Sequence, residues 1–148
     1  MWLSILVGIG YYSCSPIIVS EPACPLTQET WSHVWSPYRL KILQQCQTVT
    51  GTLVEAPYTE IDGDEHVIVR LDDQYTNLLN NKNNGTLIVE PICQKQPLEP
   101  IAALACGDYR QSIYIPAVGE HVKITGDVVL DLDHGWVEIH PVYSMERM

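Results

Sequence analysis

Carboxylates gather in two short segments of the chain, residues 60–65 and residues 127–133. The first segment contains a turn signal with Gly63, the second runs into one with Gly135, and stretches of alternating hydrophobicity flank both. Hard oxygen ligands collected on two such turns suit Ca²⁺, which takes roughly six to eight oxygens in flexible geometry. The alternative is that Asp and Gly simply form good turns. The metal-binding candidates, with Ca²⁺ as the expected cofactor, are Asp62, Asp64, Asp131 and Asp133.

A second set of candidates lies in the last predicted strand. Alternation places Trp136, Glu138 and His140 on one face of that strand. With His66 and His134 they could bind Zn²⁺ or Cu²⁺, or serve acid–base chemistry. The structural alternative is that the tryptophan covers one end of the fold while the histidines hydrogen-bond to backbone in turns. Aromatic rings can also stack against a ligand. The ligand-binding candidates are Tyr58, Tyr75, Trp136 and His140.

The residue pattern favours a binding module over an enzyme. No nucleophile with a recognisable base beside it appears in the sequence. A metal-dependent, nuclease-like hydrolase is the alternative function, and it would use the four aspartates named above with His66 or His140. Such nucleases also clamp phosphate with arginines. The arginines of this chain, at positions 39, 70, 110 and 147, are scattered.

The net charge of −10 restricts the partners. Residues 1–45 sum to zero, so all of the excess negative charge belongs to residues 46–148. Nucleic-acid binding draws on Lys and Arg that neutralise phosphates, and this chain has no basic run. The expected partners are therefore a cation, a basic protein surface or a cell-envelope ligand. Nucleic acid is disfavoured, and a membrane would be contacted only through the N-terminal segment.

Five cysteines occur in the chain, and no two of them form a Cys-x-x-Cys motif. Cys93 and Cys106 bracket a predicted insertion, and Cys24 and Cys46 bracket the segment before the first predicted strand. We predict two local disulfides, 93–106 and 24–46, each stabilising the fold by roughly 2–4 kcal/mol. The alternative is that all five are free thiols of a cytosolic protein.

Residues 1–20 carry no charge and begin with an apolar run. This pattern is typical of an export signal or membrane anchor, although a basic start and a small-residue cleavage site are missing. We therefore expect an extracytoplasmic protein, secreted or membrane-anchored. Cys14 lies in this segment, which leaves four cysteines to pair. Residues 21–45 predict a stiff linker followed by a short helical segment that packs its tryptophans on the rest of the protein.

Residues 46–148 predict one all-β domain. Its strands are expected at residues 48–54, 66–71, 86–90, 121–129 and 136–142, with a helical insertion between the third and the fourth. This order is that of a five-stranded OB-like barrel, and a small open sandwich is the alternative. OB barrels usually bind ligands with strands two and three and with the loops joining strands 1–2 and 4–5. In this chain those two loops are the acidic segments.

The sequence also resembles a group of small, uncharacterised prokaryotic proteins. The similar segments are residues 38–43, 46–52, 62–66, 87–91 and 134–142, of which the last, HGWVEIHPV, is the most specific. Those proteins are OB-like and often carry export signals. The resemblance therefore implies the fold and the compartment expected above, and it implies no catalytic residues.

Overall fold

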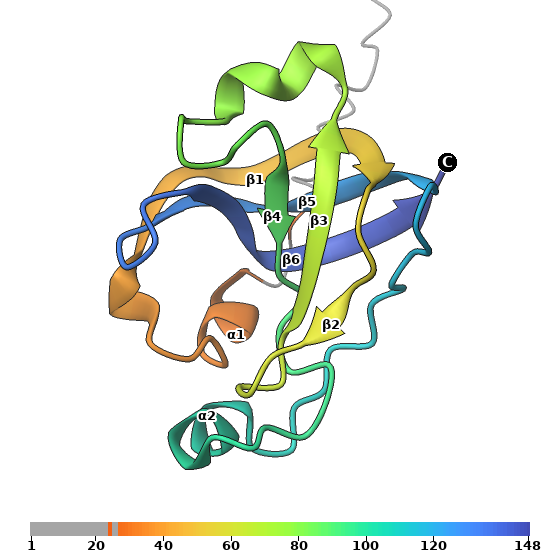
Figure 1. The fold of residues 1–148 in the computed structure, drawn as a ribbon. Coiled ribbons are helices and arrows are strands. Elements are labelled where there is room, and N and C mark those ends of the chain that lie inside the picture. The colour runs from red at the N-terminus through yellow and green to blue at the C-terminus, as the bar shows by residue number, and fades with distance from the viewer. Residues whose placement is uncertain (1–23, 25–26) are drawn as a thin grey trace, which may run out of the picture.

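Figure 1 shows the computed structural model, which describes Cys24 and residues 27–148. The predicted export segment, residues 1–20 with Cys14, lies outside the described residues. Among the described residues, no helix combines the length and the hydropathy needed to cross a membrane.

Five strands close into a mixed β-barrel, which confirms the predicted fold class and excludes the open sandwich. They are β1 (Leu40–Leu53), β3 (Glu65–Leu71), β4 (Leu87–Val89), β5 (His121–Asp131) and β6 (Val137–Arg147). β1 pairs with β5 along most of its length and with β3 near its end, and this double pairing closes the barrel. β4 and β6 run parallel, whereas the other neighbours are antiparallel.

A short sixth strand, β2 (Tyr58–Thr59), lies outside the barrel and pairs with β3. The turn between the two strands contains the predicted Asp-Gly pair. In this turn the Glu60 N–H donates to the Asp64 carbonyl at 2.8 Å, and Gly63 adopts a φ of 88° that only glycine tolerates easily. The hairpin holds Tyr58 and Glu60 beside the outer face of β3.

β1 bends where it passes from β5 to β3, and Gly51 lies at this point. A Cβ atom there would come 2.5 Å from the carbonyl oxygen of Arg70, so only glycine allows the strands to approach so closely. The sequence places this glycine inside the strand expected at residues 48–54, which is a typical position for a bend. It did not predict that β1 already begins at Leu40, because residues 41–45 are all exposed and show no hydrophobic alternation.

Two α-helices and two 3₁₀-helices flank the barrel in the described part of the chain. They are α1 (Thr27–Trp31), η1 (Pro37–Arg39), η2 (Asp73–Leu78) and α2 (Pro100–Cys106). In the view of Figure 1, α1 and α2 lie at the bottom and η2 lies at the top. The predicted N-terminal helical segment and the helical insertion between the third and fourth barrel strands are thus confirmed, the latter as α2 with Glu99 capping its N-terminus.

The hydrophobic side chains form two clusters. The larger cluster fills the barrel with alternate residues of every barrel strand, including Val67, Leu87 and Ile139. A smaller cluster lies outside the barrel and contains Val34 and Ile92 among its buried residues. It packs the segment before β1 and the region of α2 against the outer face of the sheet, so this face is covered rather than solvated.

Both predicted disulfides are present. Cys24 is joined to Cys46, and Cys93 is joined to Cys106. Disulfides form and persist in oxidising environments, which favours an extracytoplasmic location.

Candidate functional site

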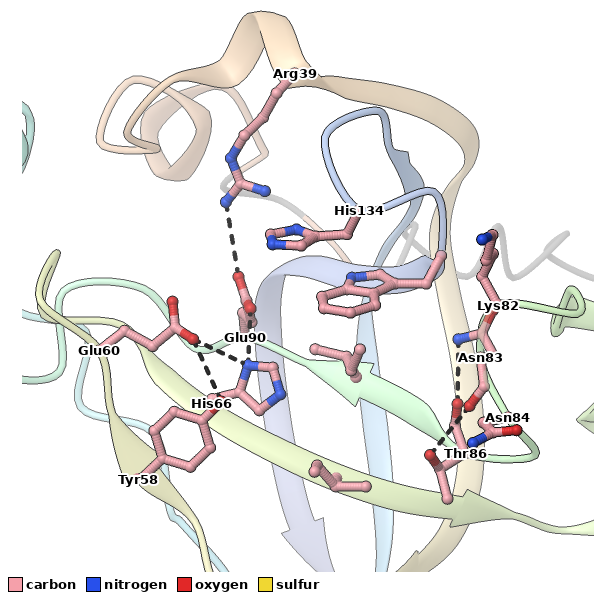
Figure 2. Close-up of a pocket in the computed structure, with 13 residues that line it drawn as sticks. Arg39, Tyr58, Glu60, His66, Lys82, Asn83, Asn84, Thr86, Glu90 and His134 are labelled. Carbon is pink, nitrogen blue, oxygen red and sulfur yellow. Dashed lines mark hydrogen bonds and ion pairs between the residues drawn. The ribbon is translucent and has the colours of Figure 1, made fainter.

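A pocket of about 430 Å³ lies on the outer face of β3 and β4. Three connections surround it: the β1–β3 loop with β2, the β5–β6 loop, and the segment between η2 and β4. Figure 2 shows the side chains that line it. The polar and aromatic members are Arg39, Tyr58, Glu60, His66, Lys82, Asn83, Asn84, Thr86, Glu90, His134 and Trp136.

The two-residue period of the strands brings the floor of the pocket together. Val67 and Val69 of β3 point into the barrel, so His66 and Ile68 point outward. On β4, paired antiparallel with β3, the same rule turns Ile88 and, just beyond the strand, Glu90 to the outer face. His66 and Glu90 therefore meet on neighbouring strands.

Two stacked ring pairs flank the pocket from opposite loops. Tyr58 stacks on His66 with ring centroids 4.8 Å apart, and His134 stacks on Trp136 at 4.2 Å. The indole N–H of Trp136 donates to Glu138 Oε2 at 2.8 Å, which fixes the ring. Tyr58 remains 51 % exposed, so a ligand can reach this ring.

Glu90 is the centre of the charged groups beneath the pocket. Its Oε1 accepts a hydrogen bond from His66 Nδ1 at 3.2 Å, and its Oε2 lies 2.7 Å from His140 Nδ1 and 4.0 Å from the Arg39 guanidinium. Burial favours the neutral form of Glu90, but the two histidines outweigh it and hold the pKa of this carboxyl well below its usual range. Glu90 is therefore a buried carboxylate.

His140 is buried behind Glu90. Its Nδ1 also lies 3.2 Å from Glu138 Oε1, and its Nε2 lies 3.8 Å from Asp64 Oδ2. Neither ring nitrogen has a hydrogen bond of normal geometry, and the same holds for Glu138 Oε1. Burial works to lower the pKa of His140, but Glu138 and Glu90 raise it well above the ordinary value. The ring is thus a buried imidazolium held by charge among carboxylates.

The titration of the neighbouring groups follows from the same arrangement. Burial lowers the pKa of His66, but hydrogen bonds with Glu60 and Glu90 raise it to about 9. Burial raises the pKa of Asp64 to about 8, although its Oδ1 accepts from the Cys93 N–H at 2.7 Å. The site therefore holds protons at neutral pH that isolated side chains would have lost.

Arg39 supplies a fixed positive charge beside these acids. Its guanidinium is paired with Asp131 and lies 4.0 Å from Glu138 Oε1. The side chain is 13 % exposed, and Figure 2 shows it reaching toward Glu90. Sequence reasoning treated Arg39 as one of four scattered arginines. Its role was missed because η1 directs the side chain toward Asp131 and Glu90, which are distant in the sequence, and no local motif indicates this contact.

The four predicted metal-binding aspartates are only partly brought together. Asp62 and Asp133 line the same small cavity of about 260 Å³. Asp131 is buried and serves its own turn, accepting from the N–H groups of Asp133 and His134 at 2.7 and 3.1 Å. Asp64 is buried on the side of His140. Calcium binding by this set remains a prediction.

The four predicted ligand-binding residues are divided in the same way. Tyr58 and Trp136 line the pocket. His140 lies beneath the pocket, on the same face of β6 as Glu138, as predicted. Tyr75 lies in η2 and packs against the barrel core instead. Glu60 and Glu90, which sequence reasoning did not name as site residues, complete the pocket. Alternation from Ile88 along β4 could have placed Glu90 on the outer face, whereas Glu60 comes from the turn between β2 and β3, where no alternation applies.

Neither a protein-family model nor a curated protein matches this chain, so its function is inferred from the chemistry of the site.

Proposed function

We propose that the protein is an extracytoplasmic binding module that holds a neutral, saccharide-like ligand of the cell envelope in the pocket on β3 and β4. The single observation that carries the proposal is the position of this pocket. It lies on the strands and between the loops with which OB barrels bind oligosaccharides and oligonucleotides.

The lining of the pocket suits a ligand that has both apolar faces and hydroxyl groups. Tyr58 offers an exposed aromatic face on one side, and the His134–Trp136 stack lies on the other. Aromatic rings bind apolar faces while polar groups fix orientation. Lys82 and Asn84 supply exposed donors, and Glu60 is half-exposed and supplies acceptors. A sugar ring has both kinds of surface, an apolar face and hydroxyl groups that donate and accept hydrogen bonds.

The charge of the protein favours saccharides over oligonucleotides, the other ligand class that OB barrels bind. The net charge of −10 opposes a phosphate backbone, and buried carboxylates lie directly beneath the pocket. A neutral saccharide meets no such repulsion. The disulfides support a location outside the cytoplasm, where envelope saccharides occur, and residues 1–20 would provide secretion or anchoring.

The test is calorimetric titration of the protein with a panel of soluble cell-envelope oligosaccharides. We expect one saccharide to bind, and Tyr58→Ala to weaken its binding by about tenfold, or 1.4 kcal/mol. Tyr114→Ala is the matched control, because Tyr114 is 45 % exposed and lies outside this pocket.

Binding of no saccharide, or equal loss in both variants, would contradict the proposal. Tight binding of a basic protein instead would favour the other partner class that the sequence predicts, and metal-dependent cleavage of a substrate would favour the hydrolase.

A further inference from the structure

Three potential ligand atoms meet at one edge of the pocket. His66 Nδ1 lies 3.2 Å from Glu90 Oε1 and 3.4 Å from Glu60 Oε1. One ligand atom from each of these residues can be chosen so that all lie within 4.8 Å of one another. Figure 2 shows the three side chains pointing toward a common point, with dashed lines from His66 to both carboxylates.

A proton satisfies this arrangement only in part. A ring nitrogen carries a single N–H, so Nδ1 can donate fully to one of the two facing carboxylates and not to both. A metal ion bonds all three atoms simultaneously. For Zn–N and Zn–O bonds of about 2.1 Å in tetrahedral geometry, the distance between ligand atoms is about 3.4 Å. Both measured distances from His66 are close to that value.

A second, independent observation comes from behind Glu90. His140 is 1 % exposed and aims its Nδ1 at Glu90 Oε2, yet neither of its ring nitrogens has a hydrogen bond of normal geometry. Carboxylate ligands of metals are commonly held by a further charged or polar group. His140 and Arg39 occupy this position, because both face the oxygen of Glu90 that is turned away from His66.

We infer that Glu60, His66 and Glu90 form a binding site for a divalent transition metal of the Zn²⁺ type, with its open coordination position facing the pocket. One nitrogen and two carboxylate oxygens suit such an ion, whereas Ca²⁺ prefers oxygen ligands alone. All three residues line the pocket, which gives the ion a route of entry and leaves room for a water or a ligand oxygen as the fourth ligand. This inference goes beyond the proposed saccharide binding and does not depend on it.

The test is titration of the metal-free full chain with Zn²⁺ by calorimetry and with Co²⁺ by visible absorption. We expect one equivalent to bind and Co²⁺ to give the intense bands of a four-coordinate site. Glu60→Gln and His66→Gln should each weaken binding at least tenfold and abolish the Co²⁺ bands. Glu60 is half-exposed, so Glu60→Gln should leave the metal-free protein folded, with its thermal unfolding midpoint lowered only slightly by the loss of the ion pair with His66.

His121→Gln is the matched control, because His121 Nε2 lies 3.0 Å from Asp72 in an exposed pair outside the pocket. It should leave Zn²⁺ binding unchanged. Absence of Zn²⁺ binding, binding that survives both site variants, or equal loss in the control would overturn the inference. A response to Ca²⁺ alone would also overturn it and would favour the acidic loops. Because no saccharide is present, either outcome leaves the proposed function to its own test.

Discussion

At the scale of single residues, Asp131 connects the end of β5 to Arg39 and to the turn that follows the strand. Its carboxylate pairs with Arg39, accepts from the N–H groups of Asp133 and His134, and lies 2.9 Å from His134 Nδ1. Burial works to raise the pKa of Asp131, but the bonds with His134 and the charge of Arg39 outweigh it and lower the pKa below 3.8. The turn therefore depends on an ionised carboxylate.

Asp131→Asn should lower the free energy of unfolding by about 3 kcal/mol at pH 7, because it removes the closest ion-pair partner of Arg39 in a largely buried position. The folded pKa lies below the unfolded value, so the contribution of this carboxylate is present above pH 3.8 and is lost as pH falls through the folded pKa. Urea unfolding at several pH values measures both effects. Asp133→Asn, at an exposed position in the same turn, should change stability by less than about 0.5 kcal/mol; equal effects of the two variants would contradict this account.

The sequence located many site residues but not their environment. Alternation correctly placed Glu138 and His140 on one strand face, since that rule depends only on backbone geometry. It could not show that this face is buried, because the cover comes from the distant segment that carries Val34 and Arg39. The same limit applies to Tyr75, which we expected to contact a ligand. Its polar surroundings in the sequence indicated a surface connection, but the segment forms η2 and packs Tyr75 against the barrel core.

At the scale of elements, close contacts between strands determine the shape of the barrel. The β5–β6 register shifts on both sides of Gly126, where β5 coils over β6. A Cβ atom at Gly126 would come 2.5 Å from the carbonyl oxygen of Pro141. This approach lies directly after His140, so the packing of one glycine helps to place a site residue. A glycine inside a strand is typical of a bend or a close approach, but the sequence does not show which strand Gly126 must approach.

Gly126→Ala should destabilise the protein by about 1–3 kcal/mol, because backbone must move to admit the methyl group. Gln44→Ala is the control, since Gln44 is exposed on β1 opposite Val128 of β5. Denaturant unfolding of the two variants gives the comparison. A shift of the His140 ring signals in the NMR spectrum of Gly126→Ala would show that the strand contact also positions this side chain, and an unchanged stability would contradict the role given to the glycine.

At the scale of the whole molecule, the site depends on two hydrophobic clusters rather than one. The barrel core fixes β3, β4 and β6, whose outer faces carry the site. The outer cluster contains both Cys93 and Cys106 and covers that face from the side of α2. Its disulfide is linked to the site through the Cys93 N–H, which donates to Asp64. The Cys24–Cys46 disulfide instead joins the N-terminal segment to β1.

Replacing each disulfide by two alanines tests whether the disulfides stabilise the protein mainly by closing a loop in the unfolded chain or mainly by packing in the folded protein. If closure of the loop in the unfolded chain dominates, the 24–46 bond, which spans 22 residues, should contribute about 0.5 kcal/mol more than the 93–106 bond, which spans 13. We expect the reverse order, with a loss of about 3 kcal/mol for Cys93→Ala/Cys106→Ala. Cys93 and Cys106 are both buried, whereas Cys46 is partly exposed. Removal of the 93–106 disulfide therefore also loosens the packing around Asp64. Urea unfolding of the two double variants decides the order; a larger loss at 24–46 would show that the outer cluster packs without its disulfide.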